Sequence, residues 1–194
     1  MRSLSKFLKW RTGLAGPEAW TSHATRDAAG RYAKGCTRLA EIGVWQGAIT
    51  CRMRAAMAPD ALLFAIDPYP PGRLGLNYQK LIARGEVSKI ANGRVEWLRE
   101  TGREAAGNPK VLAAAPFDFV FIDADHSFEG LRENWEGWAP LIAPGGVFAI
   151  HEGGVPNGPS DHGGVRFCDQ VARHDPRFEV LETVDCLLVL RRAR

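Results

Sequence analysis

Short apolar runs alternate with amphipathic stretches along most of the chain. Runs of strand length fall at residues 37–43, 61–67, 94–98, 117–123, 145–151, 178–184 and 187–192. Apolar positions at helical spacing fall at 47–57, 77–91, 101–107, 128–141 and 164–174. This alternation predicts a doubly wound α/β fold, in which helices cover both faces of a mostly parallel, seven-stranded sheet.

The last two predicted strands are joined by a connection too short for a crossover. Only the stretch Val184-Asp185-Cys186 separates them. Parallel neighbours need a connection of a dozen or more residues, whereas antiparallel neighbours need only a tight turn. We therefore expect a C-terminal antiparallel hairpin at the end of the sheet.

The first 35 residues differ from the rest. Leu4, Phe7 and Leu8 fall at helical spacing beside basic residues, which is compatible with a lid, an oligomer arm or a membrane-surface helix. A lid or packing arm is favoured, because one short amphipathic turn binds membranes weakly. We divide the chain into an N-terminal helical arm or lid, residues 1–35, and a main domain, residues 36–194.

Composition narrows the class of protein. A chain of 194 residues with 45% hydrophobic and 24% charged residues fits one globular domain. The apolar runs are too short to span a bilayer, and scattered basic residues with a net charge of +3 do not indicate a nucleic-acid partner. The four cysteines have no CxxC spacing, and no signal peptide precedes them, so we expect reduced thiols in a cytoplasmic protein.

The candidate chemistry begins at the glycine turn after the first predicted strand. Glu41 precedes Gly43, Trp45 lies inside the turn, and Gly47 closes it; Asp67 follows the second strand. In a βαβ unit such glycines let the backbone approach a nucleoside, and the carboxylate takes the ribose hydroxyls. A carboxylate and an indole make a poor phosphate cradle. The turn therefore favours S-adenosylmethionine (SAM) over NAD.

Four motifs in this order resemble those of class I SAM-dependent methyltransferases. They are residues 41–47, 65–67, 117–126 and 144–152, and the resemblance covers residues 36–193. The third motif is similar to that of the small bacterial O-methyltransferase group related to catechol and caffeoyl-CoA O-methyltransferases. The resemblance implies a Rossmann-like methyltransferase fold, with residues 36–194 as the SAM-binding catalytic domain.

The resemblance also assigns cofactor contacts. Asp67 would bind the ribose, Glu41 would help anchor the methionine amino group, and Trp45 would line the pocket. Gly43 and Gly47 would permit close approach of the backbone. Two further candidates are Thr101, where family members often touch the adenine amino group, and Asp123 at the end of the fourth strand.

A divalent metal is a further candidate at the same edge. Asp123 matches the first metal ligand of the metal-dependent relatives, whereas His151 and Glu152 replace their usual pair of ligands. Carboxylates suit Mg²⁺ or Mn²⁺, and a set with histidine also accepts Fe²⁺, Zn²⁺ or Co²⁺. A site without metal is the alternative.

Histidines supply the candidate base. His126 occupies the position of the catalytic lysine in the catechol-type enzymes, and His151 is the rival. Either could instead be a hydrogen-bonded structural histidine. Asp161 and His162 lie in a loop at 153–164, which is expected to cover the substrate.

These residues predict a SAM-dependent methyltransferase (EC 2.1.1.-) that methylates a hydroxyl of a small molecule or sugar. An NAD-dependent oxidoreductase and an inactive nucleoside-binding module are the alternatives. The expected partner is a small-molecule acceptor, and a second copy of the chain could pack through the N-terminal arm.

Overall fold

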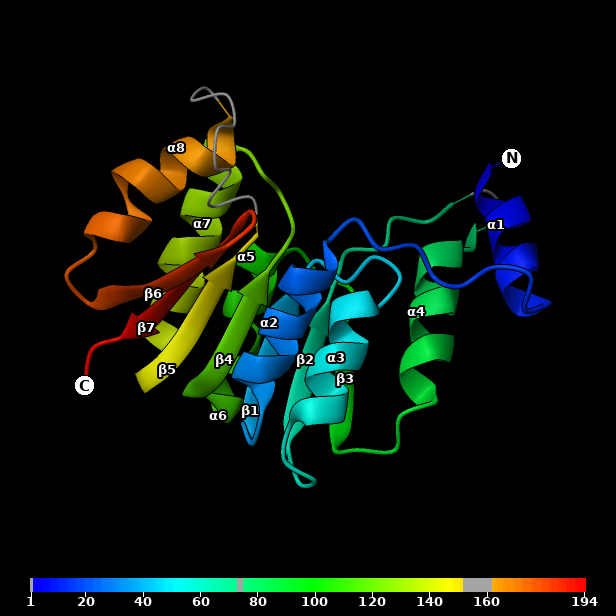
Figure 1. Cartoon of the computed structure of the whole chain (residues 1–194), viewed down its shortest axis with the longest axis horizontal. Coiled ribbons are helices and arrows are strands. Elements are labelled where there is room, and N and C mark those ends of the chain that lie inside the picture. Colours follow the sequence, from blue (N-terminus) through cyan, green and yellow to red (C-terminus); the bar gives the residue numbers. More distant parts are fainter. Residues whose placement is uncertain (1, 73–74, 152–161) are drawn as a thin grey trace.

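The computed structural model describes residues 2–72, 75–151 and 162–194. Within these ranges seven strands form one sheet in the order β3-β2-β1-β4-β5-β7-β6 (Figure 1). The strands are β1 (Arg38–Ile42), β2 (Leu62–Ile66), β3 (Arg94–Leu98), β4 (Phe117–Ile122), β5 (Ile142–Ile150), β6 (Phe178–Val184) and β7 (Leu187–Arg192). Only β7 runs antiparallel to its two neighbours, β5 and β6, among these strands. The predicted fold and its C-terminal hairpin are confirmed.

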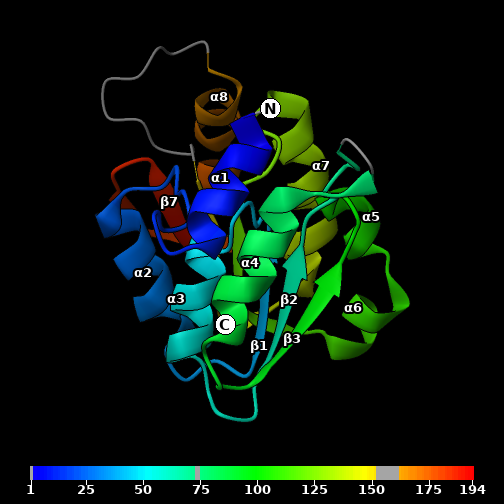
Figure 2. The same ribbon diagram turned by 90° about the vertical axis from the view of Figure 1, so that its right-hand side faces the viewer.

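Helices cover both faces of the sheet (Figure 2). One face carries α2 (His23–Ala33), α3 (Ala48–Ala56) and α4 (Tyr78–Ser88). The other carries α5 (Gly102–Ala106), α6 (Pro109–Ala114), α7 (Phe128–Trp138) and α8 (Gly163–Gln170), and 3₁₀ turns follow at Ala139–Leu141 and Ala172–His174. The helix α1 (Arg2–Arg11) lies outside these layers, against α4.

The central strands are apolar on both faces because both faces are covered. Phe117 packs edge to face against Phe64 and Trp138 on the side of α5–α8. Phe119 and Leu39 point to the opposite side, where they meet the buried alanines of α2 and the larger buried side chains of α3. The continuous apolar runs of the sequence are therefore the signal of a buried parallel sheet.

Two helices are absent from the sequence-based prediction. α2 buries only Thr25, Ala28, Ala29 and Ala33, so its buried face has small side chains and gives little hydrophobic periodicity. α6 spans 6 residues and is capped by Asn108, too short for a clear pattern. Both helices are set by tertiary contact and capping more than by apolar periodicity.

The N-terminal segment has two different parts. α1 rests on α4, with the rings of Phe7 and Tyr78 5.2 Å apart and Trp10 donating to Glu86. α2 instead packs as a core helix against α3 and the sheet. The role of residues 1–35 as a lid or arm, and the division of the chain after residue 35, stay predictions.

No helix in the described ranges has both the length and the apolar character that a bilayer crossing requires.

The carboxyl edge of the sheet has a switch point between β1 and β4. The helices that follow these two strands, α3 and α7, leave toward opposite faces. Backbone pairing continues one residue beyond the strands: Gly43 donates to Ile66 at 2.9 Å, and Asp123 donates to Ile42 at 2.8 Å. In open α/β sheets ligands bind at such a crevice. These backbone hydrogen bonds hold Gly43 and Asp123, the residues that follow β1 and β4, at this edge of the sheet.

Candidate functional site

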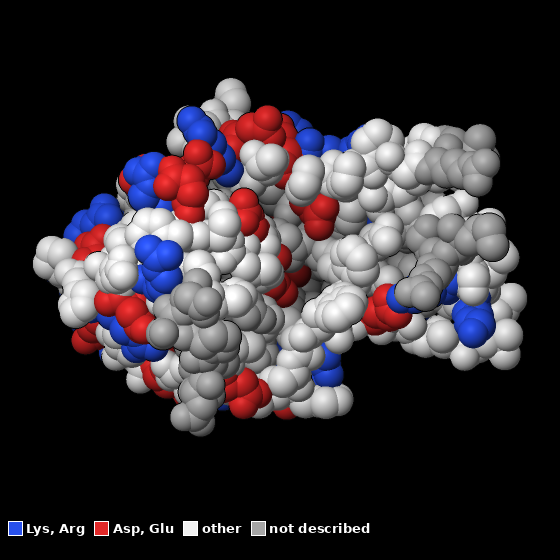
Figure 3. Space-filling view, turned by 90° about the horizontal axis from the view of Figure 1, so that it is seen from above, with Lys and Arg blue, Asp and Glu red and all other residues white. Residues whose placement is uncertain are grey.

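Two neighbouring cavities open at the switch point. The larger has a volume of about 380 Å³ and lies between the ends of β1 to β4 and the helices α5 and α7. The smaller, of about 40 Å³, lies beneath residues 18–21. Both are lined by Gly43, Trp45 and Asp123. Figure 3 looks onto this edge and shows a hollow with acidic side chains in it.

Gly43 brings two backbones into contact at the base of the crevice. Its φ is +88°, and a Cβ at this position would lie 1.8 Å from the carbonyl oxygen of Asp123. No other residue fits without moving β1 away from β4. Gly43 is therefore required for this contact between the two backbones, and its predicted close approach to a ligand stays a prediction.

Gly47 packs closely against α4, and its predicted role beside the cofactor stays a prediction. It starts α3 with a φ of +82°, and a Cβ would lie 3.2 Å from both Ala83 Cα and Val87 Cγ2 of α4. Among the described residues that line the two cavities, Gly47 is absent. Its contacts serve the packing of α3 on α4.

Trp45 adopts a conformation that large side chains rarely take. Its φ is +52°, in the left-handed region, which is a strained outlier for a bulky residue. The Trp45 N–H donates to Asp67 at 3.1 Å, and the hydroxyl of Tyr69 donates to its carbonyl at 3.0 Å. The side chain stays 40% exposed and lines both cavities.

Asp67 organises the turn as well as facing the larger cavity. Its Oδ2 accepts from the amides of Val44 and Trp45, both at 3.1 Å, and its Oδ1 accepts from Tyr69 at 2.8 Å. A carboxylate oxygen offers more than one acceptor position, so these bonds leave capacity for ligand hydroxyls. The structure thus gives Asp67 a structural role beside its predicted one.

Glu41 is a carboxyl group buried beside the smaller cavity. It is 1% exposed, and its Oε2 has no hydrogen-bond partner among the described residues. Burial raises its pKa well above the usual range, and the nearby charges of Asp123 and Asp67 raise the pKa further. An unpartnered buried carboxyl group of this kind favours a cationic group in the adjoining space.

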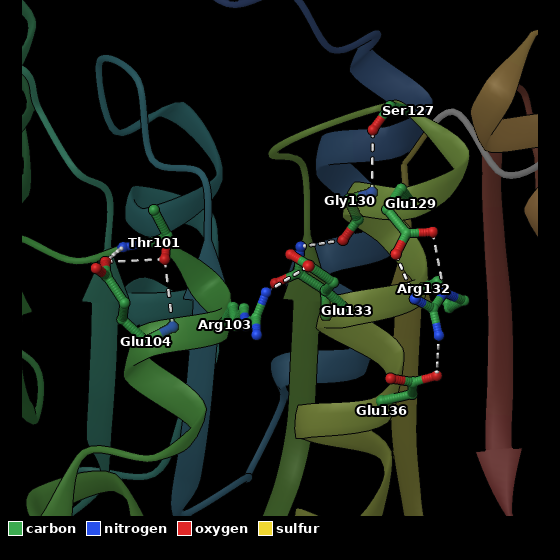
Figure 4. Close-up of polar contacts among 10 residues, drawn as sticks. Thr101, Arg103, Glu104, Ser127, Glu129, Gly130, Arg132, Glu133 and Glu136 are labelled. Carbon is green, nitrogen blue, oxygen red and sulfur yellow. Dashed lines mark hydrogen bonds and ion pairs between the residues drawn. The ribbon is translucent and has the colours of Figure 1, made fainter.

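Thr101 lines the larger cavity, but its hydroxyl also caps a helix. It accepts from the amide of Glu104 at 3.2 Å, and the Glu104 side chain reaches back to the Thr101 amide at 2.8 Å (Figure 4). Arg103 and Glu133, 2.5 Å apart, join α5 to α7 at the same wall. Capping alone explains a threonine at this position.

Asn134 is a lining residue that sequence reasoning missed. It is buried on α7, its Nδ2 donates to the Gly130 carbonyl at 2.8 Å, and its Oδ1 has no partner among the described residues. Gly102 gives it room, because a Cβ there would lie 1.9 Å from Oδ1. The available signal was a polar residue on the buried face of the predicted helix 128–141.

Both candidate histidines lie next to the Asp123 carboxylate. His126 Nε2 is 3.5 Å from Asp123 Oδ1, and His151 Nδ1 is 2.9 Å from the same oxygen. The two rings meet edge to face with centroids 6.2 Å apart. Neither histidine is among the described residues that line the two cavities. The His126 side chain is 39% exposed, so it reaches solvent.

His151 is enclosed and engaged through both ring nitrogens. It is 4% exposed, with Nδ1 facing Asp123 and Nε2 3.0 Å from the Cys186 sulfur. Burial lowers its pKa, but the hydrogen bonds with Asp123 and Cys186 outweigh burial and raise the pKa to about 10. This geometry is that of a hydrogen-bonded histidine that carries a proton at neutral pH.

The predicted metal set is only partly described. The predicted ligand Glu152 lies outside the described residues, as does Asp161 of the loop expected to cover the substrate. In the ranges that are described, no three His, Cys, Asp or Glu side chains are grouped as metal ligands. His151 does not fit the role of ligand in this arrangement, because hydrogen bonds occupy both of its nitrogens. His162 lies at the start of α8.

The fold and the edge define a class of protein. A doubly wound sheet, a tight glycine turn after β1, a carboxylate after β2 and a cavity at the switch point are the features of a nucleoside-binding α/β protein. Residues 40–153 match the family model described as a methyltransferase domain, and the chain belongs to this family. The prediction of a methyltransferase is confirmed.

Solved structures share the fold at low identity. A cofactor-bound protein from MTB aligns over 100% of this chain and 90% of its own, with a TM-score of 0.72 and 22% identity. An O-methyltransferase from Bacillus cereus in complex with SAH (S-adenosylhomocysteine) aligns over 100% and 91%, with a TM-score of 0.70 and 20% identity. The O-methyltransferase TomG from Streptomyces achromogenes, involved in tomaymycin synthesis and in complex with SAM, aligns over 100% and 91%, with a TM-score of 0.69 and 20% identity. No curated protein matches the chain by sequence.

Proposed function

We propose that this protein transfers the methyl group of SAM to a hydroxyl of a small molecule. The observation that carries the proposal is the pair of cavities on either side of Gly43, with Asp67 in the larger and the unpartnered Glu41 in the smaller. The family match supports methyl transfer, and the SAH- and SAM-bound O-methyltransferases support the cofactor and the hydroxyl acceptor.

The larger cavity would hold the nucleoside. Its volume of about 380 Å³ is in the usual range for small-ligand sites. Asp67 would accept the ribose hydroxyls, and Asn134 Oδ1, beside Thr101, would accept a hydrogen bond from the adenine amino group. Glu41 would face the cationic methionine amino group from the smaller cavity. Each role uses an acceptor that the described structure leaves available.

The acidic lining sets the charge of the ligand. Carboxylates that line the two cavities are Glu18, Glu41, Asp67, Glu100, Asp123, Asp125 and Glu133. The one described cationic side chain among the lining residues, Arg103, is paired with Glu133. Such a lining favours a cationic sulfonium and disfavours a pyrophosphate or a nucleic-acid backbone. It therefore supports SAM over NAD and a small-molecule acceptor over nucleic acid.

The transfer needs orientation and a base. When bound, SAM supplies a methyl group on a positively charged sulfur, which an acceptor oxygen displaces in line. His126 would take the acceptor proton, because its side chain is partly exposed and its Nε2 lies 3.5 Å from Asp123 Oδ1. His151 is enclosed, so we assign it to holding Asp123 in place.

The divalent ion, the cytoplasmic location and a second copy of the chain stay predictions. No step of the proposed transfer passes through a metal, because His151 does not fit as a ligand and Glu152 is not described. The partner supported here is a small-molecule acceptor.

Calorimetric titration with SAH and with NADH tests the cofactor. We expect SAH to bind and NADH to give no heat; the reverse would favour the oxidoreductase alternative. Incubation with methyl-labelled SAM and a panel of catechols and sugars then tests turnover. SAH binding without label transfer to any acceptor would favour an inactive nucleoside-binding module.

A further inference from the structure

Residues 18–21 of the N-terminal segment line the smaller cavity together with residues of β1 and the glycine turn. Two hydrogen bonds hold this stretch. The Glu18 amide donates to Gln46 Oε1 at 2.6 Å, and Arg26 of α2 donates to the Thr21 carbonyl at 2.7 Å. Thr21 is 7% exposed, so this end of the stretch is packed into the protein. The N-terminal segment therefore contributes a wall of fixed position to the cavity.

The two oxygens of the Glu18 carboxylate lie in different environments. Oε1 pairs with Lys6 Nζ of α1 at 2.5 Å. Oε2 is buried and has no hydrogen-bond partner within the described ranges. Glu41, which lines the same cavity and is 1% exposed, has a buried Oε2 in the same condition. Because a buried oxygen without a donor is costly, two such oxygens beside one cavity favour a ligand that supplies the missing donors.

The size and charge of the smaller cavity restrict the group that it can take. Its volume of about 40 Å³ exceeds the ~10–15 Å³ that one water-sized group needs and is far below that of a nucleoside site. The residues described as lining it include the carboxyl groups of Glu18, Glu41 and Asp123 and no Lys or Arg. An ammonium group is small, positively charged and carries three donors, so it matches this lining.

We propose that Glu18 is a specificity-determining residue of the cofactor site. It supplies a second carboxylate, besides Glu41, for the ammonium group of the methionine part of SAM. This role rests on the proposed function, since it places the nucleoside in the larger cavity and the amino acid in the smaller one. Glu18 then selects nucleosides that carry an ammonium group over nucleosides that do not. The N-terminal segment thereby reads the amino-acid end of the ligand.

Calorimetric titration of the full-length wild-type chain and of Glu18→Gln tests this role. Two probes are used: SAH, and the analogue of SAH that lacks only the amino group. Glu18→Gln should lower the affinity for SAH about tenfold, the size expected for one hydrogen bond to a charged group. It should not lower the affinity for the analogue, because that ligand brings no ammonium group to the cavity. Circular dichroism checks the fold of the variant.

Lys6→Met is the matched control. It removes the same ion pair from the other side and keeps the Glu18 carboxylate, so the affinity for SAH should not fall. Equal losses of SAH affinity in Lys6→Met and Glu18→Gln would assign Glu18 to holding the segment and overturn the proposal. An unchanged SAH affinity in Glu18→Gln, or an equal loss for the analogue, would overturn it as well. A wild-type chain that binds neither probe would instead overturn the proposed cofactor, and the role of Glu18 with it.

Discussion

Asp67→Ala should weaken SAH binding much more than it changes the fold. The carboxylate accepts from Val44, Trp45 and Tyr69 and is proposed to accept both ribose hydroxyls. A hydrogen bond to a charged group contributes about 1.5–3 kcal/mol. Loss of the ribose contact therefore lowers the affinity by about one to two decades, measured by calorimetry. The three amide donors also lose their partner, so we expect a lower melting temperature as well.

Asp118→Ala is the matched control for that second effect. Asp118 Oδ2 accepts from the amide of Thr37 at 2.7 Å, its hydroxyl at 2.9 Å, and the amide of Arg38 at 2.9 Å. It thus makes three similar bonds at the opposite edge of the sheet, away from the cavities. Asp118→Ala should lower the melting temperature and leave SAH affinity unchanged. Equal losses of affinity in the two variants, or none in Asp67→Ala, would refute the reasoning.

Three further predictions follow from the same site. Glu41→Gln should weaken SAM binding but raise the melting temperature of the free protein above neutral pH. Because the pKa of Glu41 is raised in the folded state, the wild-type protein is most stable at low pH and loses this stability as pH rises through the folded pKa. The difference in melting temperature between Glu41→Gln and the wild type should therefore widen in a series from about pH 4 to about pH 8. His126→Ala should slow transfer by roughly 10²–10⁴-fold with SAH affinity nearly unchanged, whereas an equal turnover in His126→Ala and wild type would move the base elsewhere. Exhaustive chelation should leave transfer intact, given the occupied nitrogens of His151; loss with EDTA and recovery with Mg²⁺ would instead establish the predicted ion with Asp123 and Glu152.

The sheet was predictable because its strands are buried on both faces. A short apolar run such as Phe117–Ile122 shows no helical periodicity, so it is assigned to a buried strand. The connection before Leu187 is so short that it permits only a hairpin. The predicted edge residues follow from strand ends, since the residue after each strand must lie at the carboxyl edge. This argument places Asp67 and Asp123 at the edge, and Glu41, the penultimate residue of β1, lies close to both.

The contacts that give these residues their chemistry were not predictable. Cys186 meets His151 only because the hairpin turns back along β5, and no spacing in the sequence encodes that distance. Asn134 required knowing which face of α7 closes the cavity. The packing of Gly47 against α4 was not predictable either, because sequence shows a turn glycine but not the helix packed against it. Local pattern predicts elements, whereas these contacts come from packing between distant segments.

The position of His151 explains how three carboxyl groups share one edge. Glu41 lies near both Asp67 and Asp123: burial raises the pKa of Glu41 well above its usual range, and the charges of Asp123 and Asp67 raise it further. A protonated His151 directly behind Asp123 places a buried positive charge against that carboxylate, at 2.9 Å. The pair offsets part of the repulsion, so that Glu41 and Asp67 can face the cavities and meet a cationic ligand. A histidine that neither lines the cavities nor acts as the base can thus still set the charge that the cofactor encounters.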